Sequence, residues 1–145
     1  MTRQLDAHCT WGWTKSGCTW EGVILDDLLK VTGWSSRATH VQLFAAGDHY
    51  QTCVTIEDAR AGIVAFSLDG AQLTPEHGAP MRFVVPPTLW QFKGPKWLSE
   101  IRLVDRFLPG FWEVGVNDAE GLIPADVLAR VADFGVLRAR LGTAE

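Results

Sequence analysis

The pattern of apolar and polar positions predicts a chain of short elements. Residues 22–31 place apolar side chains on one helical face with acidic residues and a lysine opposite, and Gly33 follows as a terminator. Residues 39–46 alternate as a strand does, residues 50–55 read as its partner after a short turn, and residues 56–61 suit a helix. We therefore expect a short amphipathic helix, a strand pair and a second short helix.

Further strands follow in the middle of the chain. Residues 63–68 predict a strand that enters a tight turn at Asp69-Gly70, because glycine there tolerates a positive φ. Residues 81–85 and 98–104 are the next strand candidates. Pro86 and Pro87 cannot donate hydrogen bonds to a ladder, so we expect the chain to leave the sheet there.

The last predicted element is a helix over about residues 124–141, with Pro124 at its first position and apolar residues along one side. Strands with a few short helices predict an α+β fold with a mainly antiparallel or mixed sheet. Since no repeat, low-complexity tract or long linker interrupts the sequence, residues 1–145 should form a single domain.

Composition narrows the classes of function. The chain has 47% apolar and 21% charged residues, which is ordinary for a globular protein. Its net charge of −4 gives no bulk attraction to nucleic acid or an anionic membrane, so placed residues must hold any anion. No apolar run has the roughly 20 residues of a membrane helix, and the first eight residues do not resemble a secretory signal. The cytoplasm is the expected compartment, unless a leader was removed.

The three cysteines differ in their surroundings. Cys53 lies in an apolar, strand-like segment and should be buried, as free cysteines usually are. Cys9 lies in a polar, aromatic run and is the better candidate for a nucleophile or a soft-metal ligand. Cys18 could pair with Cys9 or join His8 at zinc, but a zinc site needs about four ligands and no standard spacing supplies them.

Common catalytic motifs are absent from the sequence. It contains no Gly-x-Ser-x-Gly nucleophile elbow and no glycine-rich phosphate loop of the P-loop or dinucleotide type. Serine-hydrolase and nucleotide chemistry therefore have no support.

A cluster of cations remains, formed by His77, Arg82, Lys93 and Lys96, in a stretch rich in glycine and proline. Arg82 offers a planar fork for phosphate, Lys96 a compact charge and His77 ring N–H donors, which together suit an anionic cofactor. The alternative is that Arg82 projects into an internal carboxylate and both lysines are solvated.

Four ordered blocks of sequence resemble a known family. They are Asp6-Ala7-His8-Cys9-Thr10-Trp11-Gly12-Trp13-Thr14 with Trp20-Glu21-Gly22-Val23, then His77-Gly78-Ala79-Pro80-Met81-Arg82, then Lys93-Gly94-Pro95-Lys96-Trp97-Leu98, and Gly110-Phe111-Trp112-Glu113. Over about residues 6–115 the chain resembles the sulfite oxidase-like molybdopterin-dependent oxidoreductases, whose members share an oxidoreductase molybdopterin-binding domain.

The resemblance implies a fold and a site. The fold is the sulfite oxidase-type molybdopterin-binding α+β fold, with mixed β-sheets and short helices. Molybdenum is bound by the thiolate of Cys9, a suitable soft donor, and by the dithiolene of one molybdopterin. His77 and Arg82 hold the pterin and its phosphate, and Gly94-Pro95-Lys96 adds backbone contacts and a charge. Trp11 and Trp13 either shape the entrance or simply pack.

The implied activity is two-electron oxygen-atom transfer on a small-molecule substrate. Electrons then leave to a separate electron-transfer partner, a haem or flavin protein. Thr10 to Thr14 contain no arginine, whereas sulfite oxidases carry arginines just after the metal cysteine. Phe66 stands in place of a tyrosine near the metal, and Ala45 and Ala46 stand where some members place a cofactor-binding threonine. Sulfite is therefore not the expected substrate.

Only eight residues precede Cys9, whereas family members usually carry a strand and cofactor contacts there. On this interpretation the fold is N-terminally shortened, and a partner or a second copy in a homo-oligomer completes the pocket. The alternative is a degenerate, non-catalytic member that acts as a molybdopterin carrier or an interaction subunit.

Overall fold

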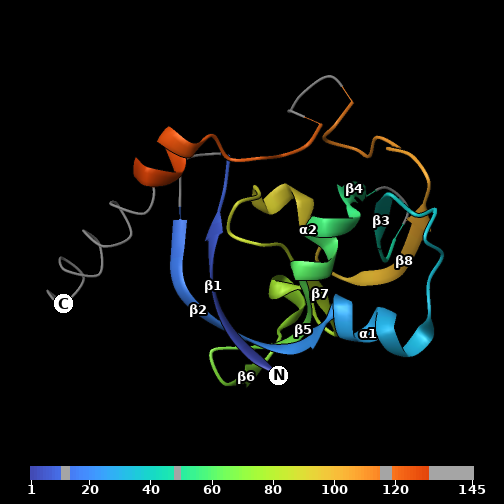
Figure 1. The fold of residues 1–145 in the computed structure, drawn as a ribbon. Coiled ribbons are helices and arrows are strands. Elements are labelled where there is room, and N and C mark those ends of the chain that lie inside the picture. Colours follow the sequence, from blue (N-terminus) through green and yellow to red (C-terminus); the bar gives the residue numbers. More distant parts are fainter. Residues whose placement is uncertain (11–13, 48–49, 115–118, 131–145) are drawn as a thin grey trace, which may run out of the picture.

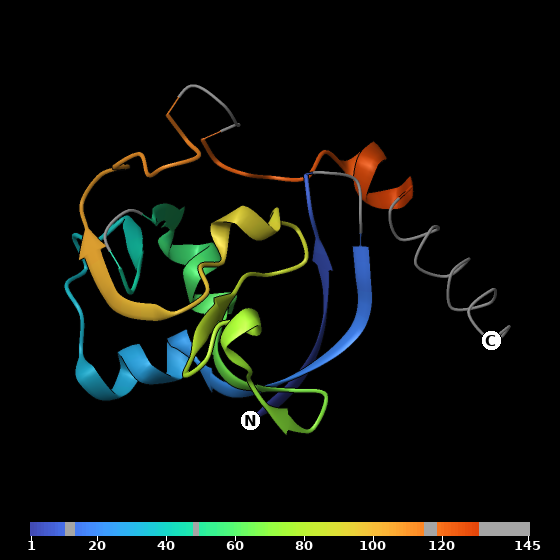
Figure 2. The same ribbon diagram turned by 180° about the vertical axis from the view of Figure 1, so that it is seen from behind.

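A computed structural model describes residues 1–10, 14–47, 50–114 and 119–130. The described strands form two sheets, joined by short helices (Figure 1). The long β1–β2 hairpin stands on one side of the molecule and the three-stranded sheet on the other, with α2 and β7 between them, as the view from behind also shows (Figure 2). This arrangement confirms the α+β class.

The larger sheet contains β1 (Thr2–His8), β2 (Thr14–Ile24), β5 (Ile63–Leu68) and β6 (Ala71–Gln72) in that order, and β7 (Arg82–Val84) also pairs with β5. All of these pairings are antiparallel. Strands β5 and β7 were predicted from the sequence, whereas β1 and β2 were not, and residues 22–24 of β2 were assigned to a helix. The reason is exposure, since β1 is buried only at its last two residues and lacks an apolar face to alternate with a polar one.

The smaller sheet has the order β4 (Gln51–Thr55), β3 (His40–Ala45) and β8 (Leu98–Val104), again antiparallel. All three strands were predicted from the sequence, β3 from its alternation, β4 as its partner after a turn and β8 as a strand candidate. Seven of the eight residues before Cys9 form β1, so a strand precedes this cysteine in the structure.

Two α-helices and two 3₁₀ turns lie between the strands of the described chain. Helix α1 (Leu25–Thr32) begins three residues later than expected, because residues 22–24 still pair with β5. It ends at Gly33, which has a φ of 72°. Helix α2 (Ile56–Ala61) has the predicted bounds. The 3₁₀ turns are η1 (Pro75–His77) and η2 (Gln91–Lys93).

At the C-terminal side, residues 125–130 are helical, and the Leu128 N–H donates to Pro124 O at 2.8 Å. The predicted continuation to residue 141 lies outside the described residues. Among the described helices, none has the length and apolar character that crossing a membrane requires.

Strand β7 separates two buried clusters. Phe83 is fully buried and packs with Leu25, Val41 and Leu43 between the helices and the smaller sheet. The next residue, Val84, belongs to a second cluster with Cys18, Trp20, Ile63 and Ala65. Since successive strand residues point to opposite faces, Arg82 shares the face of Val84. The register of β7 therefore aims Arg82 toward Trp20.

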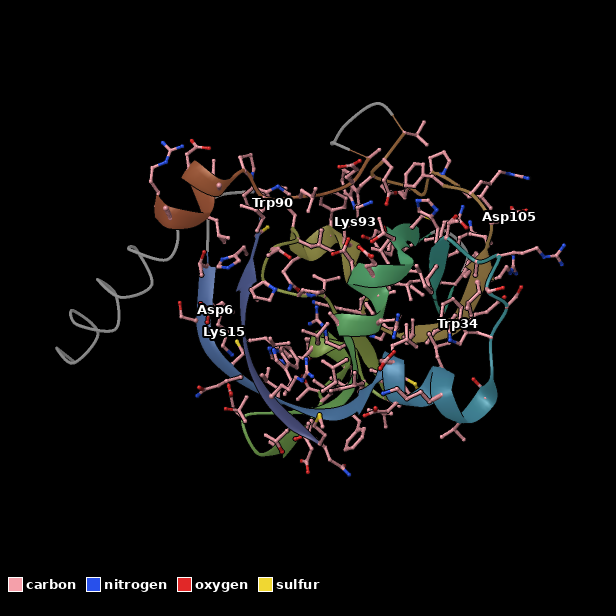
Figure 3. The ribbon with its side chains drawn as sticks, viewed as in Figure 1. Asp6, Lys15, Trp34, Trp90, Lys93 and Asp105 are labelled. Atoms are coloured by element: carbon pink, nitrogen blue, oxygen red, sulfur yellow. The ribbon has the colours of Figure 1, made fainter. Side chains whose placement is uncertain are left out.

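Lys93 is fully buried, which corrects the expectation that it is a solvated lysine (Figure 3). Its Nζ lies 2.8 Å from Glu113 Oε1, donates to Cys53 O at 2.8 Å and also donates to Ala119 O. The carboxylate of Glu113 in turn accepts from Gly110 N–H at 2.9 Å and from the Thr52 hydroxyl. The pair ties four separate segments together, and no local pattern around residue 93 indicated this.

We expect the Lys93→Met variant to lose about 3–5 kcal/mol of unfolding free energy, because it leaves the Glu113 carboxylate buried without its cation. The double variant Lys93→Met/Glu113→Leu should lose clearly less than the sum of its two single variants. Urea denaturation measures both. As a control, Arg102→Ala removes an exposed ion pair with Glu100 and should change stability by about 0–1 kcal/mol. Strict additivity in the double variant would contradict a coupled pair.

Candidate functional site

A cavity of about 860 Å³ lies where the β1–β2 hairpin faces η1, η2 and the segment that leads into β8. Its size falls within the range of small-molecule and cofactor pockets. Its walls come from segments that are distant in sequence, with Cys9 at one end of the chain and Trp112 near the other. Figure 3 labels Lys15, one of several hairpin residues that belong to this lining.

All six residues singled out from the sequence line this cavity. They are Cys9, His77, Arg82, Gly94, Pro95 and Lys96. Lys93, the remaining cation of the sequence cluster, is buried in its ion pair with Glu113 instead. The fold thus brings Cys9 and Lys96, which are 87 positions apart in the sequence, to the same cavity. The roles of the six residues stay predictions.

Cys9 follows directly after β1 and is partly exposed at the cavity. Before it, the buried His8 ring shares a hydrogen bond of 3.0 Å with Thr14 Oγ1 across the hairpin. Cys18 also lines the cavity but is buried, and its thiol donates to Lys15 O at 3.6 Å. Burial raises the pKa of the Cys18 thiol. All three cysteines are free thiols, and Cys9 is the most accessible of them.

Arg82 is a buried cation without a carboxylate among the described residues, which corrects the alternative of an internal ion pair. Its guanidinium donates to His77 O and to Gln91 Oε1, both at 3.2 Å, and its Nε–H finds no acceptor in the described part of the chain. Burial lowers the pKa of Arg82, since desolvation disfavours the charged form. A buried charge is stable only when it is paired, so this geometry suits an anionic ligand.

Lys96 and His77 stand on the same side of the cavity. The Lys96 Nζ donates to Glu76 O at 2.5 Å, and both burial and nearby Arg82 lower the pKa of Lys96. The His77 ring is exposed and shares a 2.8 Å hydrogen bond with Thr74 Oγ1, while its carbonyl holds Arg82. The backbone carbonyl of His77 therefore contacts Arg82, whereas a role of its ring in binding stays a prediction.

Gly78 lets η1 approach these cations closely, a role that sequence reasoning did not single out. Its φ is 105°, and a Cβ there would lie 2.9 Å from Lys96 Cβ and 3.1 Å from Arg82 Cβ. A larger residue would push the two side chains away from η1. Glycine is required by both backbone conformation and space.

Gly94 and Pro95 contribute less hydrogen bonding than expected. The Gly94 N–H already donates to Gln91 O at 2.9 Å, and Pro95 has no N–H. Pro95 O accepts from Phe83 N–H, and a Cβ on Gly94 would lie 2.6 Å from Phe83 O. Gly94 and Pro95 shape the wall of the cavity, and the Lys96 ammonium is the hydrogen-bond donor of this segment.

An aromatic wall faces the cavity and was missed from the sequence. It consists of Tyr50, Phe92, Trp97 and Trp112. The Tyr50 hydroxyl donates to Phe92 O, and Trp97 Nε1 donates to Pro75 O at 2.8 Å. Burial raises the pKa of Tyr50, so its hydroxyl stays protonated. These residues are scattered in sequence, so no spacing signal predicted them.

Two further expectations concern aromatic residues. Phe66 was taken to replace a tyrosine near the metal, but it is 46% exposed on β5 and is not part of the cavity lining, so that assignment was wrong. Tyr50 is a tyrosine that does line the cavity. Trp11 and Trp13, the predicted entrance residues, lie outside the described residues.

We expect iodoacetamide to label native protein at Cys9 first, to about one equivalent, because only thiolates that reagents can reach react quickly. Burial protects Cys18 and Cys53 and raises the pKa of both thiols. Mass spectrometry of peptides identifies the labelled site, and denatured protein, in which all three cysteines react, is the control. Equally fast labelling of native Cys18 would contradict the arrangement.

Comparison with known proteins identifies the family of the chain. Residues 1–112 match the family described as the oxidoreductase molybdopterin binding domain. The uncharacterized oxidoreductase YuiH of Bacillus subtilis is 36% identical over 110 residues, which cover 74% of this chain and 54% of YuiH. The mitochondrial sulfite oxidase of Drosophila melanogaster is 27% identical over 127 residues, covering 80% and 22% of the two chains. The chain thus spans about half the length of YuiH and less of the sulfite oxidase.

The fold also has a solved counterpart. The sulfane dehydrogenase SoxCD from Paracoccus pantotrophus superimposes with a TM-score of 0.64 at 22% identity, covering 73% of this chain and 32% of the other. This similarity confirms the expected fold, and the family match confirms the resemblance drawn from the four sequence blocks. The chain belongs to the sulfite oxidase-like family of oxidoreductases that share the molybdopterin binding domain.

Proposed function

We propose that the cavity binds molybdenum-molybdopterin and that the protein is an oxidoreductase that transfers an oxygen atom to or from a small molecule. In this proposal Cys9 is the metal ligand, and His77, Arg82 and Lys96 hold the pterin and its phosphate. Gly94 and Pro95 form the wall beneath it. The observation that carries the proposal is the buried Arg82, which lacks a carboxylate among the described residues and lines the same cavity as Cys9.

The described residues fit the cofactor in three respects. Cys9 offers a soft sulfur donor that is partly exposed. Arg82 and Lys96 place two positive charges in the lining, and the donors Arg82 Nε and Trp20 Nε1 have no acceptor among the described residues. The volume of about 860 Å³ suits a ligand of this class. When bound, the cofactor supplies the two-electron redox chemistry.

The side chains of the lining would bind the cofactor, orient its charged partners and exclude water from it. Arg82 would neutralise phosphate through the N–H groups that His77 O and Gln91 Oε1 leave free. Three residues of the aromatic wall, Tyr50, Phe92 and Trp112, would exclude water and leave a largely apolar entrance. Glu76, which also lines the cavity, gives its backbone oxygen to Lys96 and so orients that ammonium.

The substrate is proposed to be a small molecule other than sulfite. Residues 10–14, directly after Cys9, contain no arginine. Among the described residues of the hairpin, Lys15 is the only cation in the cavity lining. Lys15 is half exposed and lies 3.5 Å from Asp69, which already balances its charge. We further propose that electrons pass to a separate haem or flavin protein.

We expect Cys9→Ser to abolish molybdenum retention and activity, because a hydroxyl replaces thiolate poorly on this metal, while the fold persists. The matched control is Cys18→Ser, in which the hydroxyl can still donate to Lys15 O. Metal analysis and circular dichroism of protein made in a host that produces the cofactor give both readouts. Equal metal loss in both variants would argue for a paired site.

The same metal analysis separates an enzyme from a non-catalytic relative. An enzyme should carry about one molybdenum and one pterin per chain and turn over a substrate. A carrier should bind the pterin without turnover, and an interaction subunit should contain neither metal nor pterin.

We expect Arg82→Ala to retain about tenfold less cofactor after dialysis, because a charged hydrogen bond in a buried site contributes about 1.5–3 kcal/mol. Arg82→Lys should restore little, since an ammonium lacks the fork. Lys93→Ala is unsuitable as the comparison because Lys93 is buried in an ion pair. Arg102→Ala, an exposed arginine of β8, is the matched control and should retain cofactor normally. Equal retention in the Arg82 and Arg102 variants would rule out a phosphate role.

A further inference from the structure

Arg82 is held against an aromatic ring in the cavity wall. Its guanidinium carbon lies 5.2 Å from the centre of the Trp20 ring, within the range of a cation–π contact. Trp20 is only 3% exposed, and both residues line the cavity. Trp20 comes from β2 and Arg82 from β7, the two strands that flank β5. The contact therefore joins two strands that do not pair with each other.

The other contacts of Arg82 explain why an aromatic ring matters here. The two acceptors that hold the guanidinium, His77 O and Gln91 Oε1, carry no net charge. A carboxylate in the place of the ring would neutralise the guanidinium and would compete with a ligand for its N–H groups. An aromatic face attracts the cation but accepts no hydrogen bond from the N–H groups that lie in the guanidinium plane.

We propose that Trp20 is a positioning residue of the anion site: its ring keeps the Arg82 guanidinium charged and turned edge-on to the cavity, so that the free N–H groups meet a phosphate. This inference rests on the proposed function and adds to it a residue that none of the sequence evidence singled out for binding. The competing interpretation is packing, because Trp20 also belongs to the buried cluster with Ile63, Ala65 and Val84.

Binding of inorganic phosphate to the full chain, purified without cofactor, separates the two interpretations. By calorimetry we expect Trp20→Phe to bind phosphate a few-fold more weakly and Trp20→Leu about tenfold more weakly, following the order of their π faces. Arg82→Ala should bind no phosphate at this site. If Trp20→Leu does not fold, the comparison of wild type with Trp20→Phe still decides.

Two controls match the Trp20 variants. Trp34→Leu removes the ring that lies 5.8 Å from Arg60, a similar contact outside the cavity lining, and should leave phosphate binding unchanged. Leu73→Ala weakens the same buried cluster as Trp20 and is not part of the lining. It should lower the thermal midpoint but not the affinity for phosphate.

The outcomes separate failure of this inference from failure of the proposed function. If binding depends on Arg82 but is equal in wild type, Trp20→Phe and Trp20→Leu, the role of Trp20 is overturned and the anion site stands. If Leu73→Ala loses as much affinity as Trp20→Leu, packing explains the loss and the role of Trp20 is again overturned. If wild type and Arg82→Ala bind alike, or neither binds, the anion site itself is overturned.

Discussion

The site depends on one constraint, the burial of Arg82 without a carboxylate partner among the residues that the structure describes. Removing a guanidinium from water is unfavourable unless opposite charge or good acceptors replace the water. Here the described protein supplies two neutral oxygens and an aromatic face, which leave part of the guanidinium unpaired. The cavity beside Arg82 is then a place where a bound anion is stabilised more strongly than it would be at an exposed arginine.

Lys93 is a second buried cation, and its partners differ from those of Arg82. Both residues are buried cations within a stretch of twelve positions, 82–93. Lys93 is neutralised inside the protein by Glu113 and by two backbone carbonyls, so it holds segments of the fold together. Arg82 has no such carboxylate in the described chain and faces the cavity. The two cations differ in whether a buried carboxylate of the described chain pairs with them. Lys93 therefore stabilises the fold, whereas the charge of Arg82 is available to an anion in the cavity.

The two charges are also connected through the wall of the cavity. Lys93 is the last residue of η2, whose first residue, Gln91, accepts a hydrogen bond from Arg82. Glu113 follows Trp112, which belongs to the aromatic wall. The buried ion pair therefore fixes the backbone on both sides of the entrance, and the shape of the cavity depends on a contact that lies outside it.

Sequence determined a large part of the fold. Alternation and β-forming residues predicted β3, strand-like segments bounded by turns predicted β4, β5 and β8, and local turn chemistry predicted the ends of α1 and β5. Strand β1 gave no such signal because most of it is exposed at the sheet edge. The six proposed site residues came from a resemblance to a family and from the chemistry of their side chains, and the structure places all six around one cavity.

Tertiary structure decided what local sequence does not encode. Lys93 and Arg82 look alike as isolated cations in sequence, and only the position of Glu113, twenty residues after Lys93, makes one of them an internal ion pair. Likewise, no pattern in the sequence indicated that Trp20, Tyr50 and Trp112 line one cavity, because only the fold brings them together. The physical reason is that neighbours along the chain set periodicity and turns, whereas burial, desolvation and charge pairing depend on groups that meet only when distant segments pack.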